Sequence, residues 1–146
     1  MFSLRGGGLW ASDGTAAGTF RIHDLELEST ADRWTVFRGR LWFISQGGIL
    51  WTTDGTGAGT VELLDREGHM IFTPVRFAPL GGRLVFTAKD FRGNELFESD
   101  GTPAGTSPVE PLVILHLPTD LAGTGDRVFF PAYDPATGWE LWAVRP

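Results

Sequence analysis

Three aspartates have the type and spacing that could do chemistry. Asp13, Asp54 and Asp100 each begin the motif Asp-Gly-Thr-x-x-Gly-Thr, which occurs three times in the chain. Carboxylates in glycine-rich loops are typical calcium ligands. One carboxylate per copy is too few to surround a calcium ion, however, and no alternating Asp-x-Asp series supplies more.

We therefore interpret each motif as a structural turn. An aspartate can accept hydrogen bonds from amides two or three residues ahead, glycine adopts a positive φ, and threonine continues the local bonding. This interpretation predicts no metal and no cofactor. The residues assigned to the turns are Asp13, Gly14, Thr15, Asp54, Gly55, Thr56, Asp100, Gly101 and Thr102.

The aromatic residues fall into two groups. Those of the first group recur at equivalent positions of the repeat, which favours a core between sheets. They are Trp10, Trp51, Phe97 and Trp142, with Phe43, Phe86 and Phe130. The second group stands outside the pattern, in segments that we predict to be longer loops, where recognition residues often lie. These candidates for ligand contact are Phe91, Tyr133 and Trp139.

Arginines and histidines also recur. Arg40, Arg83 and Arg127 each precede an apolar run, and we expect each to pair with a nearby carboxylate or carbonyl rather than to form an anion-binding ring. The histidines keep no constant distance from the motif, so we interpret them as solvated loop residues rather than as a metal ring. They are His23, His69 and His116.

Signatures of catalysis are absent from the sequence. It contains no Gly-x-Ser-x-Gly, no His-Glu-x-x-His and no phosphate-binding loop. It also has no cysteine, which excludes thiol catalysis, disulfides and cysteine-based zinc sites. We therefore predict that the chain is not an enzyme.

Charge and hydropathy limit the partners. The net charge is −6 and no long basic run occurs, which argues against nucleic acid and anionic membranes. Apolar runs such as 113–117 are far too short to insert into a membrane. The first eight residues lack the basic and apolar regions of a signal peptide.

A repeat of about 45 residues organises the chain. The Trp or Phe that precedes each motif stands at positions 10, 51, 97 and 142. This period is the size of a propeller blade of four antiparallel strands, and the twenty glycines favour turns over helices. We predict an all-β single repeat domain over residues 1–146, with about three and a half to four β-propeller-type blades. Its units are approximately 1–30, 31–73, 74–117 and 118–146.

Each unit should contain strands a to d. Strand a is expected at 34–37, 77–80 and 121–124, and strand b at 40–45, 83–88 and 127–132. Strand c contains the Trp or Phe of the motif, and strand d is expected at 19–22, 60–64 and 106–110. The resulting order is b-c-d, a-b-c-d, a-b-c-d, a-b-c. Pro108 lacks an amide donor, which places its strand at a sheet edge.

The two ends do not complement each other, since neither supplies the strand that the other lacks. Three arrangements follow from this order. The chain is part of a longer propeller, which we favour, or it closes as a small four-bladed ring, or it associates with another copy to cover its open edges.

The motif Leu-Trp-x-x-Asp-Gly-Thr-x-x-Gly-Thr resembles the bacterial ELWxxDGT-repeat family. The preceding glutamate is present as Glu95 and Glu140, and nearly the whole chain is covered. The first two copies lack that glutamate, and the last diverges after Trp142. The resemblance implies a propeller-like fold and an extracellular or cell-surface setting, but no defined activity or ligand.

These observations favour a non-enzymatic binding or scaffold module that recognises a protein or glycan through variable loops. A carbohydrate-binding lectin that uses Phe91, Tyr133 and Trp139 is the alternative. A degenerate sialidase-like glycoside hydrolase is favoured least, because the chain has a single tyrosine.

Overall fold

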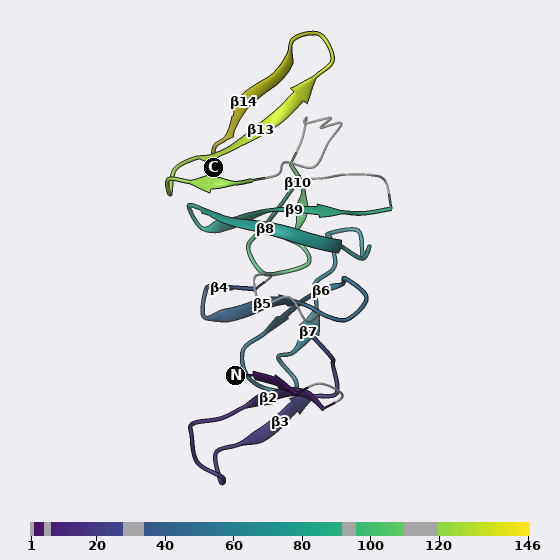
Figure 1. The fold of residues 1–146 in the computed structure, drawn as a ribbon, viewed down its shortest axis with the longest axis vertical. Helices are drawn as coiled ribbons and strands as arrows, with labels where there is room; N and C mark the ends of the chain where they lie inside the picture. Colours follow the sequence, from purple (N-terminus) through teal and green to yellow (C-terminus); the bar gives the residue numbers. More distant parts are fainter. Residues whose placement is uncertain (1, 5–6, 28–33, 92–95, 110–119) are drawn as a thin grey trace. The chain divides into compact units, whose positions relative to one another are not determined.

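The fold is all-β, as the composition predicts. A computed structural model describes residues 2–4, 7–27, 34–91, 96–109 and 120–146, and within these ranges it contains fourteen strands in four antiparallel sheets and no helix (Figure 1). No helix in the described part of the chain is therefore long and apolar enough to span a bilayer. The chain divides into two compact units, Met1–Glu62 and Leu63–Pro146.

The first unit contains two sheets. Sheet 1 has the order β1-β2-β3, and sheet 2 has the order β4-β5-β6-β7. The strands of sheet 1 are β1 (Phe2–Leu4), β2 (Gly8–Ala11) and β3 (Phe20–His23). Those of sheet 2 are β4 (Thr35–Phe37), β5 (Arg40–Ile44), β6 (Leu50–Thr53) and β7 (Val61–Glu62).

The second unit also contains two antiparallel sheets. Sheet 3 has the order β11-β10-β9-β8, and sheet 4 has the order β12-β13-β14. The strands of sheet 3 are β8 (Phe72–Leu80), β9 (Arg83–Lys89), β10 (Leu96–Ser99) and β11 (Ser107–Pro108). Those of sheet 4 are β12 (Ala122–Gly123), β13 (Val128–Asp134) and β14 (Gly138–Val144).

The predicted strand order is confirmed: the sheets contain three, four, four and three strands, each connected in sequence. Pro108 lies on β11 at the edge of sheet 3, also as predicted. Strand β8 is longer than expected, since it begins at Phe72. Phe72 pairs with Lys89 and Arg76 with Thr87, so β8 carries two extra residues there, and Thr73 takes a φ of 49°. A bulge of this kind leaves no simple alternation for sequence reasoning to find.

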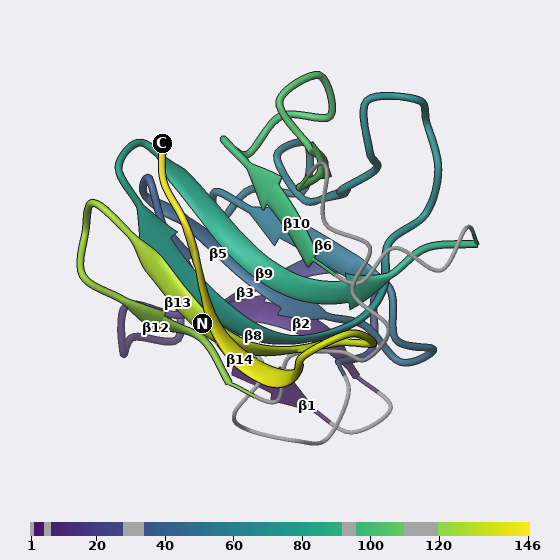
Figure 2. The same ribbon diagram turned by 90° about the horizontal axis from the view of Figure 1, so that it is seen from above.

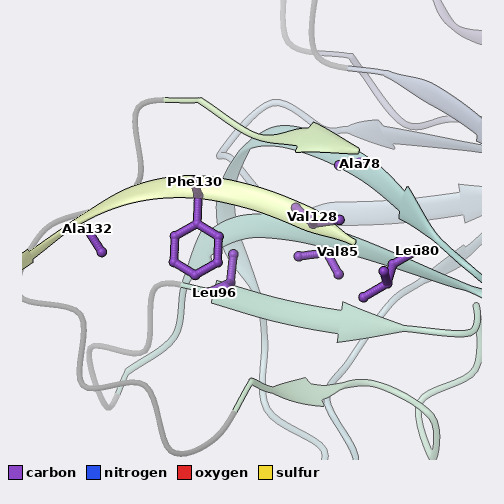
Figure 3. Close-up of a cluster of buried hydrophobic side chains, with 7 residues drawn as sticks. All are labelled: Ala78, Leu80, Val85, Leu96, Val128, Phe130 and Ala132. Atoms are coloured by element: carbon purple, nitrogen blue, oxygen red, sulfur yellow. The ribbon is translucent and has the colours of Figure 1, made fainter. Parts of the chain in front are cut away.

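One face of sheet 3 packs against one face of sheet 4. The shared core consists of Ala78, Leu80, Val85 and Leu96 from sheet 3 and Val128, Phe130 and Ala132 from sheet 4. Phe130 projects from β13 towards Leu96 (Figure 3). Phe130 is 1% exposed, and burial of such a ring stabilises the fold by roughly 1.5–3 kcal/mol. Trp142 and Val144 of β14 pack against the same core.

The first unit uses the same packing. Its core combines Leu9 of β2 and Ile22 of β3 with Phe43 of β5, and Leu41 and Trp51 pack against it. The predicted core role of the repeated aromatics is thus confirmed for Phe43, as it is for Phe130.

The sheets share one register. A phenylalanine pairs with the Trp or Phe of the motif in each of them. The four pairs are Phe2 with Trp10, Phe43 with Trp51, Phe86 with Phe97, and Phe130 with Trp142. Paired residues of an antiparallel ladder lie on the same face. We call the face that carries this pair face B, and the opposite face, which carries Leu9 in sheet 1 and Leu96 in sheet 3, face A.

In both units, face A of one sheet packs on face B of the next along the chain. Figure 2 shows the second case, in which β13 lies over β8.

Candidate functional site

The motif aspartate lies at the centre of its turn. Asp54 Oδ1 accepts hydrogen bonds from Thr56 N at 2.9 Å and from Thr56 Oγ1 at 2.8 Å. The same two bonds, at the same distances, occur at Asp13 and at Asp100. A carboxylate that accepts the amide two residues ahead forms an Asx turn.

The two glycines of the turn have different roles. Gly55 has a φ of 97° and open space where a Cβ would lie, so its requirement is conformational. Gly59 is required for space, because a Cβ there would lie 2.0 Å from Asp54 Oδ1. Its amide also donates to Thr56 Oγ1 at 2.9 Å.

A second chain of hydrogen bonds closes the turn. Thr60 Oγ1 donates to the carbonyl of Thr56 at 2.7 Å and lies 2.7 Å from Thr53 Oγ1. Its single proton goes to the carbonyl, so Thr53 must donate to Thr60 and accept from Gly55 N. Sequence reasoning missed the residue before the aspartate. The signal was present, since that position is a hydroxyl residue in every copy: Ser12, Thr53 and Ser99.

These bonds favour the ionised carboxylate. The amide of Thr56, and then its hydroxyl, hold the pKa of Asp54 below its ordinary value of 3.8, and Thr15 does the same for Asp13. Among the described residues, no group of three or more His, Asp or Glu side chains could hold a metal ion. The arrangement stabilises a turn with bonds from inside the motif.

The arginines at the start of the b strands pair as expected. Arg40 donates to the carbonyl of Gly59 and to Thr52 Oγ1, and its guanidinium lies 3.7 Å from Asp54. Arg83 pairs with Glu98 across the sheet. Arg127 Nε lies 3.8 Å from Asp126 Oδ2. Arg40 therefore ties its strand to the motif turn of the same repeat.

Tyr133 and Trp139 do not lie in a loop, and this expectation was wrong. They are paired residues of β13 and β14, on face A of sheet 4 at the loop end of the hairpin. Their rings meet edge to face, with centroids 5.8 Å apart and planes at 68°. Such aromatic cross-strand pairs stabilise a hairpin, which explains why the strands continue to this point. Trp139 is 59% exposed, so the pair presents an aromatic surface to solvent.

Phe91 lies just after β9 and contacts His69, one of the three histidines that the sequence led us to interpret as solvated loop residues. Phe91 is 65% exposed, and its ring centroid is 4.5 Å from that of His69. His69 is not a simple solvated loop residue. Its ring Nδ1 lies 3.1 Å from Asp65 Oδ2, and its amide donates to Asp65 Oδ1 at 2.8 Å.

Asp65 fixes the orientation of this imidazole. Its side chain is 1% exposed, and it also accepts the amide of Glu67. Burial opposes ionisation of Asp65, but the bonds from His69 and Glu67 outweigh it, and the pKa of Asp65 lies below 3.8. An ionised carboxylate only accepts, so His69 Nδ1 must donate. The other ring nitrogen, Nε2, is then the acceptor in the neutral ring.

The interpretation of His23 as a loop residue also fails, because it ends strand β3. Its ring lies 5.4 Å from that of Trp51, and its Nδ1 is buried without a hydrogen-bond partner among the described residues. A hollow of about 270 Å³ is lined by Arg21, Ile22, His23 and Asp24. No motif or residue spacing in the sequence predicts this hollow. His116 and Glu95 lie outside the described residues.

The candidate ligand-contact residues thus form two separate groups of contacts, Tyr133 with Trp139 and Phe91 with His69. No protein-family model, curated protein or solved structure matches the chain. The resemblance to ELWxxDGT repeats rests on the motif residues, and the function has to be argued from the geometry.

Proposed function

We propose that this chain is a non-enzymatic binding or scaffold module, built of β-propeller-type blades and recognising a protein or glycan through residues outside the repeated motif. One observation carries the proposal. The polar side chains of the motif bond within their own turn, whereas the exposed aromatics Trp139 and Phe91 lie at segments that differ between repeats.

The blade interpretation is supported by the strand order and the packing. The two complete sheets are four-stranded meanders, and face A of one sheet meets face B of the next in both units. Radial or stacked repeats are built from this relationship.

The lectin alternative is favoured by the aromatic surface at Tyr133 and Trp139. A sugar ring presents an apolar face that packs on an exposed tryptophan, and a tyrosine hydroxyl beside it can bond to sugar hydroxyls. Phe91 with His69 offers a comparable combination of a ring and a polar nitrogen.

A glycan array tests this alternative directly. Binding of the labelled chain, reduced at least about tenfold by Trp139→Ala, is expected if the hairpin end holds the sugar. Val36→Ala is the matched control, because Val36 is also an exposed apolar strand residue. A uniformly negative array rejects the lectin, and turnover of any chromogenic glycoside rejects the non-enzymatic proposal.

A further inference from the structure

Face A of sheet 4 is apolar, and several of its described residues are exposed. Leu141 is 74% exposed, Ala143 is exposed, and their cross-strand partners Pro131 and Phe129 are half-buried. The opposite face of the same sheet holds the buried residues of the core. An antiparallel sheet with one solvated face normally places polar residues there. This alternation is absent from face A.

The register shows what face A is suited to contact. Phe129 of sheet 4 occupies the position of Val85 in sheet 3, and Leu141 occupies that of Leu96. Val85 is fully buried and Leu96 is 3% exposed, because face B of the following sheet covers both. Sheet 4 therefore keeps the apolar positions that receive a following sheet.

The side chains that cover such a face are also defined. Phe130 and Trp142 of sheet 4, both on face B, belong to the core formed with sheet 3. Phe43 and Trp51 have the same role on sheet 1. In sheet 1, the backbone of Phe2 pairs with that of Trp10 in the same register, so the sequence has the same residue types at these two positions of sheet 1.

We propose that face A of sheet 4 binds face B of sheet 1 of a second copy, so that chains associate head to tail. The new contact continues the packing already present twice within the chain. Such an interface uses two different surfaces and extends into longer assemblies unless the rotation closes a ring. It also covers an apolar surface that would otherwise remain in water.

The inference does not depend on the proposed ligand site. Tyr133 and Trp139 lie on the same face but at the loop end of the hairpin. The position of Tyr133 corresponds to Lys89 of sheet 3, which is exposed although Val85 and Thr87 on the same face of β9 are buried. Trp139→Ala should therefore leave self-association unchanged.

Light scattering of the whole chain tests the proposal over protein concentrations from about 1 µM to about 1 mM. The wild-type mass should rise from 15.9 kDa to multiples of that value. Leu141→Lys should remain at 15.9 kDa at every concentration. Val36→Lys is the matched control, since Val36 and Leu141 are 73% and 74% exposed, and it should associate like the wild type. A monomeric wild type, or identical behaviour of the two variants, overturns the proposal.

A mixing experiment tests the polarity. Trp10→Lys removes the other surface and should also be monomeric. An equal mixture of Trp10→Lys and Leu141→Lys retains one intact pair of faces, so it should form a two-copy complex and nothing larger. Association of Trp10→Lys alone would indicate a symmetric contact through face A and reject the head-to-tail arrangement. Circular dichroism melting checks that each variant is folded, and the Leu141→Lys and Val36→Lys comparison decides the proposal if Trp10→Lys is not.

Discussion

Gly59 lies against the carboxylate of Asp54 so closely that no side chain fits: a Cβ on Gly59 would be 2.0 Å from Asp54 Oδ1. Gly18 and Gly105 stand in the same relation to the aspartates of their own turns, at 2.1 Å. The second glycine of the motif is therefore required by its neighbour, and the aspartate and glycine should behave as one unit.

Gly59→Ala should destabilise the first unit by about 1–3 kcal/mol, since the turn must open to relieve the overlap. Asp54→Ala removes the overlap together with the hydrogen bonds of the turn. The double variant should thus be no less stable than Asp54→Ala alone, and urea denaturation of the four proteins gives the coupling. Additive losses would show that the two residues act independently.

Acid should weaken the first unit partly through Asp54. Its pKa in the folded chain lies below 3.8, so the ionised form stabilises the fold above that pH, and the contribution is lost as pH falls through the folded pKa. Asp54→Asn cannot titrate, and its melting temperature should fall less steeply than that of the wild type between about pH 4 and about pH 2. If the melting temperatures of the two proteins fell equally steeply with pH, the stabilising role of the ionised Asp54 would be contradicted.

The hydrogen bond between the two hydroxyl groups should contribute more to the free energy of unfolding in the motif copy where it is buried. Thr60→Val keeps the shape but leaves Thr53 Oγ1, which is 1% exposed as a residue, without its acceptor. We expect a loss of about 1–3 kcal/mol in the free energy of unfolding. Thr19→Val is the matched control in the same unit, because its partner Ser12 is exposed and water can replace the bond. Equal losses would show that burial does not set the cost.

The tautomer of His69 is fixed by Asp65. Nitrogen NMR at about pH 9 should show the proton on Nδ1 and none on Nε2. Asp65→Ala should remove this preference and lower stability by about 1.5–3 kcal/mol, as expected for bonds to a charged acceptor. Asp65→Asn retains an oxygen for the two amides and should lose less stability. A proton on Nε2 in the wild type would refute the assigned hydrogen bond.

The strand order could be predicted because it depends on local signals. Apolar runs such as Arg83–Lys89 are bounded by glycine turns, and a repeated motif aligns uncertain segments with clear ones. Strand β8 shows the limit. Its bulged start near Thr73 takes a positive φ that residue type does not indicate.

The site was less predictable because contacts across sequence decide it. Tyr133 and Trp139 extend a hairpin by packing on each other, so a stretch with turn residues became strand. Asp65 and His69 are joined within a turn outside the motif, and their relation to Phe91 depends on a different hairpin. By contrast, Ser12 and Thr53 could have been found by comparing the motif copies position by position.

The side-chain hydrogen bonds within each motif turn join eight consecutive residues, from Thr53 to Thr60 in the second copy, and Arg40 of the same repeat adds a bond to the carbonyl of Gly59. A turn of this kind is held by residues of its own repeat. Duplication of the gene segment that encodes one repeat carries a complete turn with it, and no residue elsewhere has to change in order to receive it. Between the threonine and the second glycine of the motif, only the first of the two positions differs between the copies, as Ala16, Gly57 and Pro103; the second is alanine in all three. An array of such repeats can therefore grow or shrink by whole units while its connecting segments diverge.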